Sequence, residues 1–431
     1  MHGTSHASSG LAYGLAFFYF FGLLLNLGFA AYQWYVAKNR GQTLLWGAVA
    51  GVFAILGLVN LVAGLSGGHG PVIPDALRVG IDALMGPITY TTLSLAAFAA
   101  LIVFRRTFTK PAVAWGLLNL SLLFGGLAMT DVNFRSIVAK EDNVPITLLI
   151  YSVGFTTWLA LRRGVINDDR MAKGEPPLEK LDDEKVLVWP DLVYTELIAM
   201  IIATVVLVVW AIVLKAPLEQ PATNARAPNP SKAPWYFLGL QEMLVYFDPW
   251  MAGVVLPTFI IIGLLAIPYI DFNPLGNGYY TFKQRPFAVV TYMFGFLVLW
   301  VVLIILGTFL RGPNWNFFGP FEYWDTHKVD PLNNVNLSEL FWQRLLGQKV
   351  EGMPWLKREF PGILFVLAYL FAVPPLLARL MPKFFMKMGF IRFFLLVTLL
   401  QFMASLPIKM VLRWAINLKY IVYIPEYFFN I

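Results

Sequence analysis

The sequence predicts an all-α integral membrane protein. Of its 431 residues, 58% are hydrophobic and only 13% are charged, whereas soluble domains carry roughly 25% charged residues. The apolar residues form long runs, and a helix needs about 20 of them to cross a bilayer. The net charge of +7 is not gathered into a dense basic cluster with interleaved aromatic residues. We therefore expect basic loops at a membrane surface and no nucleic-acid partner.

Ten runs are long and apolar enough to be predicted as transmembrane helices, five in each half of the chain. They lie at about 11–37, 43–66, 82–104, 112–131, 144–162, 191–214, 251–270, 287–310, 361–380 and 390–412. The first is too long and too aromatic for a cleavable signal peptide. The predicted parts are a five-helix membrane domain (1–165), a cytoplasmic polar linker (166–190), a domain at 191–330, and an outer loop with two further helices (331–431).

Basic residues near helix ends indicate the orientation. With the N-terminus outside, 17 of the 32 lysines and arginines fall in the five segments predicted to face the cytoplasm. Loops on the cytoplasmic side of a membrane are enriched in these residues. Ten spans return the chain to its starting side, so we expect both termini on the outer side.

The loop after the sixth span carries the strongest functional signal. A helix is expected to begin at Pro234, because proline suits the first turn. The residues that follow are apolar apart from Gln241 and Glu242 and are too few to span, which predicts a short interfacial helix. Burial there should raise the pKa of Glu242, so that it could accept a proton from a substrate hydroxyl near neutral pH. Alternatively, Glu242 reaches water and the aromatic residues form an interfacial belt.

An ordered set of short motifs in the second half resembles the C-terminal half of cytochrome b, and subunit IV of cytochrome b/f complexes in particular. The motifs are Trp189–Leu192, Pro234–Phe237, Gly253–Leu256, Gly263–Tyr269 and Gln284–Ala288. The resemblance covers about residues 189–330, with the loop from Arg311 to His327 looking like the outer loop of bacterial members. The first five spans resemble no family that we can name.

The resemblance implies a quinol oxidation site on the outer side, capped by the loop that contains Pro234. In that family a Pro-Glu-Trp-Tyr motif supplies a glutamate that accepts the quinol proton. Here Pro234 stands at the glutamate's position, while Trp235 and Tyr236 match the motif. We therefore expect Glu242, with Tyr236, to do the acid–base chemistry. The expected contacts to the quinone, menaquinone or ubiquinone, are Pro234, Trp235, Phe237 and Asp248. A simple interfacial anchor is the alternative for Trp235 and Tyr236.

Two charged residues at the opposite ends of these helices are further candidates. By the same resemblance, Asp191 and Arg285 lie near an inner quinone site or proton path. Charged groups close to a membrane are functional candidates by default. Helix capping and the positive charge of cytoplasmic loops would explain them equally well.

The scarcity of histidine argues against haem in this chain. The four histidines are His2, His6, His69 and His327, and none lies within a predicted span. Two haems in a four-helix bundle need four axial ligands, normally histidines on facing helices. With no cysteine either, the chain cannot hold a Rieske centre or attach haem c. We expect no metal site here, haem b in a dihaem partner subunit like the N-terminal half of cytochrome b, and a Rieske or c-type cytochrome subunit as acceptor.

The sequence thus predicts a haem-free subunit of a bacterial quinol–cytochrome c reductase in the inner membrane, active in electron transport only with its partners. The first five spans would dock other subunits and lipid. A secondary transporter with inverted five-helix repeats is an alternative, although the first and sixth spans lack central breaks. A purely structural membrane anchor of a respiratory complex is the other.

Overall fold

The computed structural model describes residues 9–431, except for 69, 183, 215, 217–220, 222, 225–226, 277 and 331–332. His2, His6 and His69 therefore lie outside the described residues. The described chain is mostly helical, with almost no strand. Nine of its helices are long and apolar enough to cross a membrane, or ten if one bent pair counts as a single span. The predicted class, an all-α multi-pass membrane protein, is confirmed.

The bent pair corrects the third predicted span. In place of one helix at 82–104, α3 (Asp75–Leu84) and α4 (Pro87–Val103) meet at 83°. The break falls at Gly86, which is extended and precedes Pro87 at the first position of α4. Proline has no N–H to donate and disfavours helical geometry in the residue before it. Hydropathy alone did not reveal this break, because the apolar residues Ala83–Met85 continue without interruption into Pro87 and the apolar residues of α4.

The chain divides into two compact units. Unit 1 comprises Met1–Ala227 with the segments Gly278–Gln284 and Phe317–Thr326, and unit 2 comprises the remainder. This division differs from the predicted one, in which the linker at 166–190 separates the halves. The fifth span does not end at 162 but continues as a helix to Ala172, because its last turns bind other segments of unit 1.

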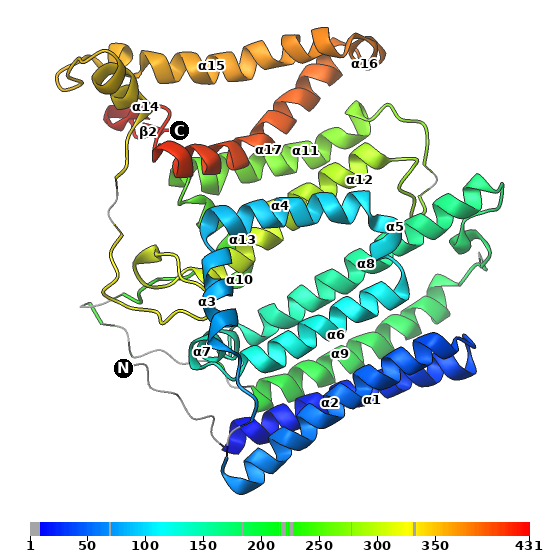
Figure 1. The fold of residues 1–431 in the computed structure, drawn as a ribbon. Coiled ribbons are helices and arrows are strands. Elements are labelled where there is room, and N and C mark those ends of the chain that lie inside the picture. The colour runs from blue at the N-terminus through cyan, green and yellow to red at the C-terminus, as the bar shows by residue number, and fades with distance from the viewer. Residues whose placement is uncertain are drawn as a thin grey trace. The chain divides into compact units, whose positions relative to one another are not determined.

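Unit 1 contains the helices of the first half and the helix after the linker. They are α1 (Ser9–Tyr35), α2 (Arg40–Ser66), α3, α4, α5 (Arg105–Phe108), α6 (Pro111–Ala128), α7 (Val132–Val138), α8 (Val144–Ala172), η1 (Leu178–Lys180), η2 (Val188–Leu192) and α9 (Val193–Val213). The hairpin of α1 and α2 packs along its whole length (Figure 1). Rings of one helix lie directly on glycines of the other, as Phe53 does on Gly22 and Phe20 on Gly57. Such small residues allow close packing of membrane helices.

A buried polar contact ties α1 to α6. The side-chain amide of Asn26 donates to Oδ1 of Asn119 at 2.6 Å, and the indole N–H of Trp115 donates to Oδ1 of Asn26 at 2.9 Å. Both asparagines are almost fully buried. Polar side chains inside a bundle hold helices in register when they form hydrogen bonds with each other, so these three residues hold α1 and α6 together.

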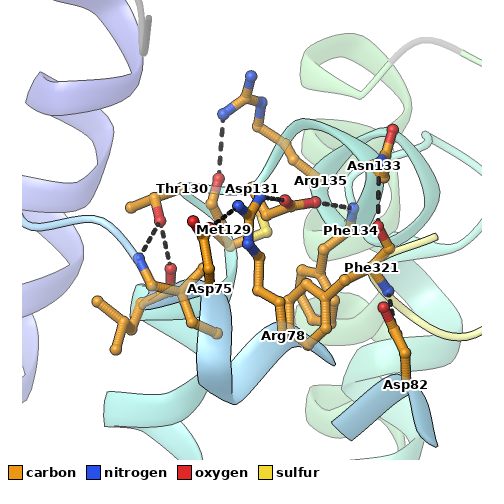
Figure 2. A network of polar contacts seen from close by, with 12 residues as sticks. Asp75, Arg78, Asp82, Met129, Thr130, Asp131, Asn133, Phe134, Arg135 and Phe321 are labelled. Atoms are coloured by element: carbon orange, nitrogen blue, oxygen red, sulfur yellow. Dashed lines mark hydrogen bonds and ion pairs between the residues drawn. The ribbon is translucent and has the colours of Figure 1, made fainter. Parts of the chain in front are cut away.

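The segment Phe317–Thr326 is held in unit 1 by residues of α3 and α7. Asp82 accepts a hydrogen bond from the backbone N–H of Phe321 at 2.9 Å, and the amide of Asn133 donates to its carbonyl at 3.0 Å (Figure 2). The ring of Phe321 stacks on Phe134 with centroids 5.3 Å apart. Asp131 caps α7 and pairs with Arg78 at 2.8 Å. The Asp82 carboxylate thus binds backbone, and the Asp131 carboxylate binds backbone and Arg78.

The segment Gly278–Gln284 is held in unit 1 by the end of α8. Asp168 accepts the backbone N–H groups of Phe282 and Lys283 at 3.1 to 3.3 Å, and Asn167 donates to the carbonyl of Tyr280 at 3.0 Å. The guanidinium of Arg105 lies 3.9 Å from the ring centroid of Phe282. The polar residues predicted to begin the linker are therefore helical and partly buried.

Unit 2 contains the helices of the second half. They are α10 (Trp235–Met243), η3 (Met251–Val255), α11 (Leu256–Ile270), α12 (Pro286–Met293), η4 (Phe294–Val301), α13 (Val302–Ile305), η5 (Leu306–Leu310), η6 (Pro313–Trp315), α14 (Leu337–Glu339), η7 (Leu340–Leu345), α15 (Trp355–Leu380), α16 (Pro382–Met388), α17 (Phe390–Ile416) and η8 (Pro425–Tyr427). Here α12, η4, α13 and η5 are consecutive parts of one 25-residue span. A short hairpin of β1 (Tyr423–Ile424) and β2 (Phe429–Asn430) ends the chain.

The core of unit 2 lies where α10 and the loop after it meet the spans. Its buried side chains come from that loop, α11, α13 and α17, and include Tyr246, Phe247, Leu256, Leu303 and Met410. The C-terminal tail, residues 418–431, is bound beside it, since Leu337 donates to Tyr420 and Trp250 donates to Asn430. The helix α10, which is predicted to bear the functional residues, thus packs on the most buried part of unit 2.

Candidate functional site

The short helix predicted from the sequence is α10, and it has two different faces. Leu238, Gly239, Glu242 and Met243 are buried. This side packs against the neighbouring span, since a β-carbon on Gly239 would lie in ordinary van der Waals contact with the carbonyl oxygen of Trp300, at 3.6 Å. The helix is therefore held firmly by one face.

The first turn of α10 exposes aromatic side chains. The exposed fractions are 37% for Trp235, 47% for Tyr236 and 51% for Phe237. The rings of Tyr236 and Phe237 lie 4.8 Å apart between centroids, and Pro234 before them is exposed and extended. The four residues predicted to match the quinol-site motif thus form one exposed surface, here called the aromatic face (Pro234–Phe237).

The buried face of α10 is anchored by an ion pair. Nη2 of Arg311 donates to Oε1 of Glu242 at 2.8 Å, and Nε donates to both carboxylate oxygens at 3.1 and 3.2 Å. Glu242 is 0% exposed and Arg311 is 8% exposed. Nη1 of Arg311 also donates to the carbonyl of Trp315 at 3.1 Å. One guanidinium therefore joins α10 to the end of the span at 286–310 and to the loop beyond it.

Sequence reasoning did not identify Arg311 as a site residue. The available signal was a single arginine directly after an uninterrupted apolar run and before Gly312-Pro313. Gly312 and Pro313 end the helix there, and a charged arginine at the edge of a membrane span needs a partner. Nothing in the sequence, however, indicates that the partner is a glutamate 69 residues earlier.

Two opposing influences act on the Glu242 carboxyl. Burial raises its pKa above the usual range, and the charges of Arg311 and Lys232 and the hydrogen bonds from Arg311 oppose that rise. The net direction is upward, as the sequence predicts. The alternative in which Glu242 reaches water is wrong, because its side chain is fully enclosed. Trp235 lies nearly two turns before Glu242 on the same side of α10, whereas Tyr236 and Phe237 point to other sides.

The proline-rich segment before α10 is tied down by Gln241. Its Oε1 accepts the backbone N–H of Ala233 at 2.7 Å, and its Nε2 donates to the carbonyl of Ser231 at 2.9 Å. Pro234 offers no capping side chain, and the Gln241 amide instead binds the backbone of the residues before the helix. Gln241 therefore determines where the chain enters the aromatic face.

Replacement of Gln241 by alanine is expected to loosen the segment before α10. Each lost hydrogen bond should cost about 1 kcal/mol, and the amides of 231–233 should exchange hydrogen at least several-fold faster. Hydrogen–deuterium exchange followed by mass spectrometry measures this. Gln343→Ala, at an exposed position of unit 2, is the control. Unchanged exchange at 231–233 would contradict the role of Gln241 in holding this segment.

Asp248 is placed by the C-terminal tail and is not part of the aromatic face. Its Oδ1 accepts a hydrogen bond from the hydroxyl of Tyr420 at 3.1 Å, and Nδ2 of Asn430 lies 3.4 Å away. Burial, followed by the neighbouring Asp248, raises the pKa of Tyr420 to about 12. Asp248, predicted as a contact to the quinone, thus anchors the C-terminal tail in the structure.

The two predicted inner-side residues fall in different units. Asp191 belongs to η2 of unit 1, where it is exposed. Arg285 belongs to unit 2 and pairs with Asp271, and its Nη2 donates to the carbonyl of Asn273 at 2.8 Å. Arg285 closes the loop between α11 and α12, which accounts for its position without a ligand.

No family model matches the chain, and no solved structure matches it.

Among the described residues, no group of three histidine, aspartate or glutamate side chains is placed to hold a metal ion. His327 follows the segment Phe317–Thr326 and begins the last part of unit 2. The site defined by the geometry is therefore the aromatic face of α10 with the buried Glu242–Arg311 pair behind it.

Proposed function

We propose that this chain is a haem-free subunit of a bacterial quinol–cytochrome c reductase and that the aromatic face of α10 forms part of its quinol oxidation site. The observation that carries the proposal is a short helix whose first turn exposes three aromatic rings while a buried ion pair holds its last turn. Quinone sites are mostly apolar and need rigid walls with few polar groups. The motif resemblance at Trp235 and Tyr236 supports the same assignment.

In this proposal the residues of α10 have separate tasks. Trp235 and Phe237 form apolar walls for the quinol ring, and the Tyr236 hydroxyl supplies a hydrogen bond to a quinol oxygen. Glu242 lies behind these residues and is held by three hydrogen bonds from Arg311. We therefore assign Glu242 mainly to positioning α10, with proton acceptance as the role that a Glu242→Gln variant would test.

The proposed partners follow from the chemistry that the chain lacks. Haem b is expected in a separate dihaem subunit, and a Rieske or c-type cytochrome subunit accepts the other electron. The quinone, menaquinone or ubiquinone, is the substrate. The proposed location is the bacterial inner membrane, with both termini on the outer side.

The proposal is tested by purifying the full chain with its partners in mild detergent. We expect b-type haem in the complex and reduction of a c-type cytochrome that depends on added quinol. Solute uptake driven by an ion gradient in vesicles containing this chain alone would indicate a transporter. A complex without b-type haem and without quinol oxidation would indicate a structural anchor. Either outcome removes the proposed function.

Replacement of Trp235 by alanine is expected to lower quinol-dependent cytochrome reduction about tenfold or more, because an aromatic wall of the site is lost. The complex should remain assembled, since Trp235 is more than one-third exposed. Phe371→Ala, which removes a side chain 70% exposed on α15, should leave the rate unchanged. Equal rates in both variants would refute the assignment of the aromatic face.

A further inference from the structure

The connection between α15 and α17 is a short helix at the end of two membrane-crossing elements. Both α15 and α17 are long and apolar enough to cross the membrane, and α16 has only seven residues (Figure 1). A helix of this length cannot cross a bilayer. It must lie where the membrane meets water, at the level of the lipid headgroups.

This connection carries only positive charge. Residues 379–392 include four basic residues and no acidic one. Arg379, Lys383, Lys387 and Arg392 are all exposed. Among the ion pairs of the described residues none involves these four, whereas Arg285, Arg311 and Arg358 of the same unit each have a carboxylate partner. The surface therefore presents unneutralised cations.

Aromatic residues fix α16 to the rest of unit 2. Phe384, Phe385 and Met388 pack with Ala266 and Ile270 of α11 and with Phe393 of α17. The ammonium group of Lys387 lies 5.2 Å from the ring centroid of Phe272. The basic side chains thus project from a firmly mounted helix and not from a loose loop.

Apolar side chains surround the exposed cations. Met381 is 49% exposed, Met386 73%, Phe390 64% and Ile391 80%. In water such a surface would be unfavourable, whereas at a membrane it meets acyl chains while the cations meet headgroups. The surface combines the two chemistries that a phospholipid offers, an anionic phosphate next to hydrocarbon.

We propose that residues 379–392 form a binding surface for anionic phospholipids. Lys383 and Lys387 lie one turn apart on the same side of α16 and hold the phosphate, with Arg379 and Arg392 flanking them. The exposed methionines and Phe390 contact the acyl chains. Clusters of basic residues directly beside a transmembrane helix attract anionic lipid, and each contributes about fivefold to affinity. The proposal does not depend on the quinol assignment.

The test measures lipid binding to the full chain, with its partners where these co-purify. The protein in neutral detergent is titrated with phosphatidylglycerol and, separately, with phosphatidylcholine, and bound lipid is counted by native mass spectrometry. The double variant Lys383→Gln/Lys387→Gln is expected to bind phosphatidylglycerol about 25-fold more weakly, with little change for phosphatidylcholine. Lys383→Arg/Lys387→Arg should keep the wild-type preference, and added salt should weaken it.

A control removes the same charge elsewhere in unit 2. Arg344→Gln/Lys349→Gln changes two exposed basic residues near η7 and should leave phosphatidylglycerol binding within about twofold of wild type. The proposal is overturned if the two double glutamine variants lose binding equally, or if wild type does not prefer phosphatidylglycerol. Displacement of the bound signal by inorganic phosphate alone would also overturn it, because the acyl contacts would then contribute nothing.

Discussion

Replacement of Arg311 by methionine is expected to destabilise unit 2 by about 3–5 kcal/mol, because it leaves the Glu242 carboxylate buried without its partner. Three hydrogen bonds from the guanidinium would be lost at once, together with the bond to the carbonyl of Trp315. Unfolding of the chain in detergent micelles, followed by heat or by added SDS, measures the loss.

The loss caused by Arg311→Met should depend on pH in a defined direction. Without Arg311, only the charge of Lys232 still opposes the effect of burial on the Glu242 carboxyl, so its pKa in the folded state rises further above the unfolded value. A raised folded pKa gives stability at low pH that is lost as the pH rises through that value. The variant should therefore be closer to wild type at about pH 5 than at about pH 8.

Two further variants distinguish the effect of losing the whole Glu242–Arg311 ion pair from the effect of losing one partner. Glu242→Leu/Arg311→Met removes both charges and should recover most of the stability, since replacing a whole buried ion pair with apolar residues is often neutral. Glu242→Gln should cost less than Arg311→Met, because an amide oxygen still accepts from the guanidinium. If Arg311→Met is as stable as wild type at both pH values, the ion pair does not hold α10.

Replacement of Gly362 by alanine is the second change with a large expected effect. Gly362 lies in α15, and a β-carbon there would overlap the carbonyl oxygen of Ile421 and lie 3.1 Å from Cγ2 of Val422. The clash is with backbone, which cannot rotate away as a side chain can. The expected loss is about 1–3 kcal/mol, although alanine favours helix over glycine.

The structural consequence should appear in the C-terminal tail. Next to Gly362, the buried carboxylate of Glu359 accepts the N–H of Tyr423 at 2.9 Å, and Arg358 donates to the carbonyl of Tyr423 at 3.2 Å. Displacement of the tail should break these bonds and expose the amides of 418–431 to exchange.

Hydrogen–deuterium exchange of the tail, compared with that of Gly295→Ala, tests this. Gly295 lies in the span at 286–310 of the same unit, and a β-carbon there meets nothing within 4 Å. The tail should exchange faster only in Gly362→Ala. Equal protection of 418–431 in the two variants would show that the tail does not depend on this close approach.

Composition and hydropathy were sufficient to predict the class of fold. A helix that crosses a bilayer needs a long apolar run, and its backbone hydrogen bonds are made within the helix itself. Each span can therefore be predicted from its own stretch of sequence. The short helix α10 was predictable for the same reason, because a proline begins it and its apolar run is too short to cross. The exposed Trp235 and Tyr236 follow from the local motif.

Only the tertiary structure decided which polar groups meet. Glu242 is paired with Arg311, Asp248 with Tyr420, and Asp82 with the backbone of Phe321, each across a long stretch of sequence. The bend at Gly86 is also invisible to hydropathy, which measures the length of an apolar run and not its direction. Pairing of buried charges depends on how distant segments fold together, so the sequence predicted that Glu242 is unusual, and the fold determined what binds it.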